Sequence, residues 1–284
     1  MNTLTAHPHV VLSIAGSDPS GGAGIQADIK TISALGGYAA AAITAITAQN
    51  TLGVQGIFPV QPEVLRAQLT SVMDDLHPTA VKIGMVHDAE QVAVIADILQ
   101  RYVPPFVVYD PVMVSTSGRR LMTEETVACI EQNLFPLCTL ITPNLDEASL
   151  LMYCLLHTPE EMTSAGRTLS SRYGCHVLVK GGHLDGEEMC DILCTQSEST
   201  TFRAPRTHSN NLHGTGCTLS SAIATRLSQG YSLHTAVASA KEYVSRAIQQ
   251  GSTLRIGQGN GPLWHFGFTP HTEQESEPMP ERGR

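Results

Sequence analysis

Short apolar runs alternate along this chain with longer segments in which apolar residues recur every three or four positions. The short runs are apolar throughout, which predicts strands of a sheet that is covered on both faces. They lie at residues 10–15, 38–44, 80–83, 106–109, 139–142 and 176–179. Two further short segments, 189–193 and 200–203, predict a hairpin.

The longer segments have the spacing of helices. Leu65 and Leu69, for example, follow Pro62, a residue that suits a first helical turn. Helices are predicted around residues 24–35, 62–76, 92–99, 127–134 and 159–173, and from 215 and 233 onward. Strands and helices that alternate at these lengths predict an α/β fold, a mostly parallel sheet with helices on both faces. We expect one domain over residues 10–268, a flexible tail at 1–9 and a disordered tail at 269–284.

Composition and charge narrow the classes of function. The 284 residues carry a formal net charge of −9 at pH 7, whereas nucleic-acid binding calls for a basic face. No apolar run reaches the ~18 residues of a transmembrane helix, and the first ten residues lack a signal-peptide pattern. Seven cysteines, mostly in apolar stretches, predict free thiols. We expect a cytoplasmic protein that binds neither nucleic acid nor membrane.

The first predicted strand leads into a loop, residues 16–24, that holds four glycines and a proline. Ligands of open α/β sheets gather at the carboxyl ends of strands, so this loop is a candidate site. Residues 22–27 match a dinucleotide-binding GxGxxA pattern, but no acidic residue lies between Asp28 and Glu63 to bind a ribose hydroxyl. The pattern therefore argues against a dinucleotide oxidoreductase. A tight turn without ligand contact remains the alternative for this loop.

Residues 211–218 are the strongest single motif, because Gly214 and Gly216 directly precede an apolar helical run. Glycines allow close approach of the backbone to a ligand, and a helix start offers unpaired amide hydrogens to an anion. Cys217 would lie at the mouth of this site, where a thiol has a lowered pKa and can act as base, acid or hydrogen-bond partner. The motif predicts a site that holds a phosphoryl group in transit.

Charged residues end several other predicted strands. Lys180 precedes a flexible glycine pair and suits a triphosphate, while a snorkelling strand-end lysine is the alternative, also for Lys82. Asp110, Asn144 and Glu147 together have the oxygen donors to hold Mg²⁺ mostly through waters. For Asn144 and Glu147, spaced i, i+3, a helix cap is the alternative interpretation.

Two neutral residues complete the set of candidates. Gln49 ends an apolar segment, and an amide can read a ring nitrogen beside an amino group. Its alternative is an amide bonded to backbone. His213, beside the glycine motif, is the one histidine with an indicated role. The chain has no GxSxG, no P-loop and no histidine metal motif, so phosphate must bind by another arrangement.

Taken together, these loops resemble the ribokinase-like superfamily of small-molecule kinases. The closest likeness is to the hydroxymethylpyrimidine/phosphomethylpyrimidine kinases of thiamine biosynthesis, and it spans roughly residues 10–268. The motifs that carry it are residues 15–28, 47–50, 81–85, 110–113, 142–144, 180–183 and 213–218. The resemblance implies a three-layer ribokinase-like fold and a homodimer. It also implies Mg²⁺- and ATP-dependent phosphorylation of 4-amino-5-hydroxymethyl-2-methylpyrimidine, then of its monophosphate.

The resemblance also implies roles for single residues. Those expected around the ring substrate, with Gln49 on the aminopyrimidine edge, are Gly16, Asp28, Gln49, Met85, Val112 and His213. Those expected to serve phosphoryl transfer are Gly214, Thr215, Gly216 and Cys217 in the anion hole, Lys180 and Asn144 on ATP, and Asp110 and Glu147 on Mg²⁺. Many sugar kinases of the superfamily have an aspartate base where this chain has Cys217.

Two other functions are compatible with parts of the pattern. Pyridoxal also carries a ring hydroxymethyl group, so a pyridoxal or pyridoxine kinase of vitamin B6 salvage, or an enzyme of dual specificity, is the near alternative. A catalytically silent relative that binds a vitamin precursor as a sensor belongs to another class. The intact glycine motif and Lys180 argue against it.

Overall fold

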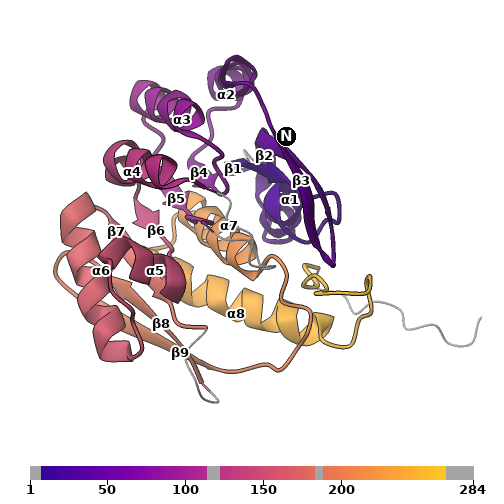
Figure 1. Cartoon of the computed structure of the whole chain (residues 1–284), viewed down its shortest axis with the longest axis vertical. Coiled ribbons are helices and arrows are strands. Elements are labelled where there is room, and N and C mark those ends of the chain that lie inside the picture. The colour runs from indigo at the N-terminus through magenta and orange to yellow at the C-terminus, as the bar shows by residue number, and fades with distance from the viewer. Residues whose placement is uncertain (1–7, 114–121, 183–187, 267–284) are drawn as a thin grey trace, which may run out of the picture.

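The computed structural model describes residues 8–113, 122–182 and 188–266. The predicted tails lie almost wholly outside these ranges, so the expected domain limits stay a prediction. Within the described ranges, nine strands form one sheet in the order β3-β2-β1-β4-β5-β6-β7-β8-β9 (Figure 1). The strands are β1 (Val10–Ser17), β2 (Tyr38–Asn50), β3 (Gly53–Pro59), β4 (Ala80–Ile83), β5 (Phe106–Tyr109), β6 (Leu140–Ile141), β7 (His176–Lys180), β8 (Glu188–Cys194) and β9 (Ser199–Pro205).

The centre of the sheet is parallel and both of its edges are antiparallel. Strands β2, β1, β4, β5, β6 and β7 run parallel, whereas β3 pairs antiparallel with β2. Strands β8 and β9 form the predicted antiparallel hairpin, which confirms that expectation. Strand β3 was not predicted. It contains Gly53, Gly56 and Pro59 and none of its residues is fully buried, so it lacks the apolar run that marks the central strands.

Helices cover both faces of the sheet (Figure 1). Side chains of α2 to α6 pack on one face with Leu12 and Ile14, and those of α1, α7 and α8 pack on the other face with Val11. Successive strand residues point to opposite faces, so one strand contributes to both cores. The helices are α1 (Gly24–Ala34), α2 (Pro62–Leu76), α3 (Ala89–Tyr102), α4 (Glu124–Asn133), α5 (Leu145–Met152), α6 (Pro159–Tyr173), α7 (Thr215–Ser228) and α8 (Leu233–Gly251). The predicted three-layer α/β fold is confirmed.

The carboxyl ends of the parallel strands meet at one edge of the sheet, which is where α7 begins. The chain passes from β1 to β2 on one side and returns to β4 on the other, so a crevice opens between β1 and β4. The loops that carry the sequence motifs all leave the sheet at this edge. In the part of the chain that is described, no helix has both the length and the apolar character to cross a bilayer.

Candidate functional site

The first turn of α7 supplies the glycine-lined half of the site. Gly214 is its N-cap and has φ 85°, a left-handed conformation that favours glycine. A Cβ at this position would also lie 1.8 Å from the carbonyl oxygen of Gly22. Thr215 begins the helix, and the amides of Gly216 and Cys217 follow in a turn that has no intrahelical acceptors for them. Such a helix start favours an anion.

A lysine and an aspartate lie against this helix start. Lys180 Nζ donates to Asp110 Oδ1 at 2.6 Å, and Thr142 Oγ1 donates to the same oxygen at 3.1 Å. A Cβ at Gly216 would lie 3.0 Å from Asp110 Oδ2 and 3.3 Å from Lys180 Nζ. Burial alone would lower the pKa of Lys180, but the charges of Asp110 and Glu147 raise it above its ordinary value. The site therefore holds a permanent cation beside the amides of α7.

Asn144 and Glu147 form a capping box at the start of α5. The Glu147 amide donates to Asn144 Oδ1 at 2.8 Å, and the Asn144 amide donates to Glu147 Oε2 at 2.8 Å. Asn144 and Glu147 therefore cap α5, as the alternative interpretation of the pair predicted. Burial raises the pKa of Glu147 to about 7, with Lys180 opposing the shift and Asp110 adding to it. Glu147 thus lies close enough to the Lys180–Asp110 pair for both charges to affect its pKa.

Cys217 does not have the lowered pKa that its place at a helix start led us to expect. Burial raises the pKa of the thiol to about 11, and the charges of Asp28 and Asp110 add to the effect of burial. Lys82 and a hydrogen bond from the Gly24 amide oppose the shift but do not reverse it. The expectation of a lowered pKa is wrong because it counted the helix dipole and left out, first, the burial of the thiol and, second, the two nearby carboxylates. The thiol is protonated at neutral pH in this state.

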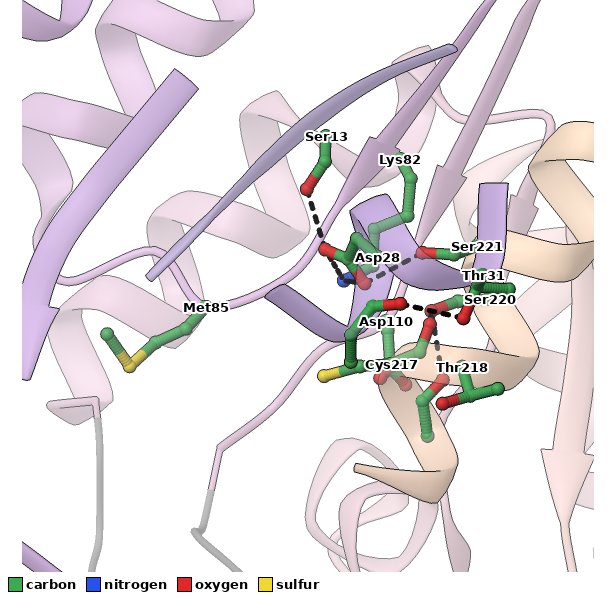
Figure 2. A network of polar contacts seen from close by, with 12 residues as sticks. Ser13, Asp28, Thr31, Lys82, Met85, Asp110, Cys217, Thr218, Ser220 and Ser221 are labelled. Atoms are coloured by element: carbon green, nitrogen blue, oxygen red, sulfur yellow. Dashed lines mark hydrogen bonds and ion pairs between the residues drawn. The ribbon is translucent and has the colours of Figure 1, made fainter. Parts of the chain in front are cut away.

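Asp28 lies beneath the site instead of in the ring pocket that the resemblance implied. Its two oxygens accept from Lys82 Nζ at 2.9 and 2.8 Å, from Ser13 Oγ at 2.6 Å and from Ser221 Oγ at 2.7 Å (Figure 2). Both charged side chains are fully buried. The charge of Asp28 is therefore matched inside the protein, and it ties α1, β1, β4 and α7 together.

A cavity opens between the end of β1 and its loop, the hairpin of β2 and β3, and the loop after β4. Of the six residues expected around the ring, only Asp28 does not line this cavity. The five that do are Gly16, Gln49, Met85, Val112 and His213. Gly16 packs against Met85, since a Cβ at this position would lie 2.8 Å from Met85 Cε, the end of a flexible side chain. Met85 and Val112 give the cavity apolar surface, while Gln49 and His213 give it polar groups. Such a lining suits a small polar aromatic ring.

The polar end of the cavity is a chain of hydrogen bonds. His213 Nε2 lies 2.9 Å from Asp18 Oδ2 and 3.1 Å from Gln49 Nε2. Asp18 also accepts from groups of its own glycine-rich loop, namely Ser20 N and Oγ, Gly22 N and Ala23 N. Although burial raises the pKa of Asp18, the hydrogen bonds from His213, Ser20 and Ala23 lower it to about 2. Asp18 is therefore a carboxylate at neutral pH.

Two residues of this region had no assigned function in the sequence interpretation. Lys82 was weighed only as a strand-end lysine, and its partner Asp28 lies 54 positions away, so no local pattern joins them. Asp18 is part of an Asp-Pro-Ser-Gly run that is typical of a turn, and that turn does form. A turn signal alone does not show that His213 comes within reach of the same carboxylate.

Comparisons with known proteins show the family of this chain. The family model described as phosphomethylpyrimidine kinase matches residues 18–264. A hydroxymethylpyrimidine/phosphomethylpyrimidine kinase of Rhizobium meliloti is 49% identical over 258 residues, which cover 90% of this chain and 97% of that protein.

Two solved structures have the same fold. The phosphomethylpyrimidine kinase of Clostridium difficile 630 has a TM-score of 0.76 at 42% identity and covers 84% of this chain and 99% of its own. An ADP complex of Bacillus subtilis pyridoxal kinase has a TM-score of 0.84 at 33% identity and covers 91% and 97% of the two chains. The chain therefore belongs to the phosphomethylpyrimidine kinase family.

Proposed function

We propose that this protein is an ATP-dependent kinase of thiamine biosynthesis. It phosphorylates the hydroxymethyl group of 4-amino-5-hydroxymethyl-2-methylpyrimidine and then converts the monophosphate to the diphosphate. The observation that carries the proposal is that a residue of the ring cavity directly precedes the glycine-lined start of α7. His213 lines the cavity, and Gly214 to Cys217 follow it directly at the first turn of α7.

In this proposal the protein contributes mainly position and charge, which are what phosphoryl transfer requires. The substrate hydroxyl oxygen forms a bond to the terminal phosphorus of ATP, the bond to ADP breaks, and the hydroxyl proton is released. The amides of Gly216 and Cys217 and the ammonium of Lys180 stabilise charge on the transferred group. The Cys217 thiol is protonated, so it orients the hydroxyl and is not a ready base in this state.

The residues present fit a nucleotide that carries Mg²⁺. Mg²⁺ usually keeps several waters and takes one or two carboxylates together with phosphate oxygens. Asp110 and Glu147 are the carboxylates that would hold it, beside Lys180 and the cap of α5. Among the described residues no group of three or more His, Cys, Asp or Glu side chains could hold a metal ion, so the proposal assigns the remaining ligands to phosphate and water. When bound, the ion supplies positive charge to the phosphates.

We also propose a homodimer in the cytoplasm. Ile46 of β2 and Phe58 of β3 are direct partners in the sheet ladder, and their exposed fractions are 55% and 62%. An exposed apolar pair on an edge of the sheet supports contact with a second copy. All seven cysteines are free thiols, which suits a reducing compartment. Light scattering on wild type and on Phe58→Glu tests the dimer, which this change is expected to dissociate.

The second candidate is pyridoxal kinase activity, and a structural neighbour favours it. The pyridoxal kinase of Staphylococcus aureus, solved in complex with pyridoxal, has a TM-score of 0.84 at 31% identity. Turnover of pyridoxal and of the aminopyrimidine separates the two candidates. Gln49→Leu is expected to reduce kcat/KM for the aminopyrimidine by about 10- to 100-fold, because it removes a donor and an acceptor. Pyridoxal lacks the same ring pattern and is expected to lose less.

The direct experiment follows ³¹P NMR signals of purified protein with ATP, Mg²⁺ and the hydroxymethylpyrimidine. We expect the monophosphate to appear first and the diphosphate to follow. A folded protein that transfers phosphate to neither substrate would contradict the proposal. Cys217→Ser tests the role of the thiol: it keeps a small hydroxyl that can orient the substrate, so it should retain phosphoryl transfer if the thiol is not the base.

A further inference from the structure

The hydrogen bonds around His213 determine which of its ring nitrogens carries a proton. Nε2 lies 2.9 Å from Asp18 Oδ2, and four donors of the glycine-rich loop keep Asp18 ionised. A carboxylate only accepts hydrogen bonds, so Nε2 must carry the hydrogen between the two residues. A protonated Nε2 has no lone pair left for an amide N–H. Gln49 Nε2 lies 3.1 Å from His213 Nε2, so two donors face each other in this orientation of the amide, and a turn of 180° lets the Gln49 oxygen share the Nε2 hydrogen with Asp18.

Thr47 fixes the other end of the same amide. Thr47 Oγ1 lies 2.9 Å from the carbonyl oxygen of Ser17 and 3.3 Å from Gln49 Oε1, so the shorter contact, to Ser17, takes its hydrogen. A hydroxyl whose only hydrogen is used in this way can only accept from Gln49. These hydrogen bonds favour the amide turned by 180° from the arrangement with Nε2 at His213 and Oε1 at Thr47, so that the nitrogen faces Thr47 and the oxygen faces His213. The two amide atoms have the same shape, so their order is set by the hydrogen bonds around them.

We propose that Asp18 and His213 are positioning residues that lock the Gln49 amide in one of its two orientations. The locked amide offers the cavity an acceptor on the His213 side and a donor on the Thr47 side. An aminopyrimidine complements this order when its amino group lies toward His213 and its ring nitrogen toward Thr47. The choice of ring rests on the proposed function, whereas the lock itself does not.

The lock has a consequence for specificity. A glutamine that is free to rotate by 180° reads either an amino group beside a ring nitrogen or the reverse pattern. The reverse pattern belongs to the 4-oxo ring, which has an N–H donor beside a carbonyl acceptor. Turning the locked amide would oppose donor to donor at His213, so the lock should favour the amino ring by about 10- to 100-fold.

The proton position is measured directly by ¹⁵N–¹H NMR of the imidazole rings in the ligand-free protein. The His213 signals are assigned by their loss in His213→Gln. Between pH 7 and 8 we expect Nε2 to be protonated, with its hydrogen bonded to Asp18. An Nε2 without a proton would overturn the lock. This measurement needs no substrate, so its outcome is independent of whether the proposed function is right.

The specificity is measured with the 4-amino and 4-oxo forms of the hydroxymethylpyrimidine. The readout is the ratio of their kcat/KM values, or of their Kd values where turnover of the oxo form is too slow. His213→Met removes the donor and is expected to lower the ratio by about 10- to 100-fold, mostly through KM. His213→Gln places an N–H close to the position of Nε2 and should restore most of the ratio. An unchanged ratio in His213→Met would overturn the proposal, whereas failure of wild type to bind or phosphorylate either ring would overturn the proposed function.

Discussion

Two lysines of the central sheet each form an ion pair with an aspartate, and the two pairs differ in their surroundings. Lys82 and Asp28 are both fully buried, and serines occupy the remaining acceptor positions of the carboxylate. Lys180 and Asp110 lie at the carboxyl edge of the sheet, with 15% and 3% of their side chains exposed, beside the glycine of the α7 start. The first pair is sealed, and the second can be reached by a ligand.

The comparison teaches that surroundings decide what such a pair does. In the sequence both lysines look alike, since each lies near the end of an apolar run and close to a glycine. The sealed pair has no free position for a ligand, so it orients the elements around it. The open pair has a cation next to unpaired amides, so it can bind phosphate. Substitution of each lysine should therefore damage a different property.

Lys82→Met should have the largest effect, and the effect should be on stability. It leaves the carboxylate of Asp28 buried without its counter-charge, which costs about 3–5 kcal/mol. Urea unfolding of both proteins measures the loss. The double variant Lys82→Met with Asp28→Asn is the matched control and should recover part of it, because no charge is left buried. A loss below about 1 kcal/mol for the single variant would remove the distinction between the two pairs.

Lys180→Met should mainly reduce activity. Loss of one stabilising donor from the site is expected to lower kcat by about 10²–10³ for both phosphorylation steps. Stability should fall less than in Lys82→Met, because 15% of the Lys180 side chain is exposed at the edge of the sheet whereas Lys82 is fully buried. Parallel measurements of kcat and of urea unfolding test this, with Lys180→Arg as a variant that keeps the charge. A stability loss as large as that of Lys82→Met would contradict the account.

The smallest expected effect is on the pH dependence of stability, and it comes from Glu147, which lies beside the open pair. Its pKa of about 7 in the folded protein lies above the ordinary value of 4.5, so the folded state favours the protonated form. The raised pKa of Glu147 therefore adds nothing unfavourable to the free energy of unfolding below about pH 4.5, and the protein loses stability as pH rises from there through 7. Between pH 5 and 8, wild type should lose about 1–3 kcal/mol relative to Glu147→Gln, which keeps the helix cap.

Unfolding curves of both proteins at several pH values measure this difference. Lys180 lowers the pKa of Glu147, so the same loss should move to higher pH in a Lys180→Met background. A difference between wild type and Glu147→Gln that stays constant from pH 5 to 8 would mean that Glu147 is not buried beside these charges. The sealed pair would then be the only one with strong electrostatic coupling.

The central part of the fold was predictable from sequence because buried parallel strands are apolar throughout. Strand β3 was missed because it is a half-exposed edge strand held by pairing with β2, and pairing leaves no local apolar signal. The site loops were found because glycines, an aspartate and lysines follow strands at positions where the chain must leave the sheet. Helix α5 was anticipated only by its cap residues, Asn144 and Glu147.

What sequence could not provide were the contacts between distant residues. The place of Asp28 depends on Lys82, and the pKa of Cys217 depends on its burial and on the charges of three residues from other elements. The lock on Gln49 needs Asp18 and His213, which are 195 positions apart. Each of these is a sum of long-range interactions, whereas a motif describes only neighbours along the chain.

The central claim is that the ring cavity and the α7 start hold the two reacting groups next to each other. A crystal structure with the hydroxymethylpyrimidine and a non-hydrolysable ATP analogue tests it most directly. We predict the ring on the edge of Gln49, and its hydroxyl oxygen about 3–3.5 Å from the terminal phosphorus, at the amides of Gly216 and Cys217. A ring bound outside the cavity, or a terminal phosphorus remote from Gly216, would contradict the account.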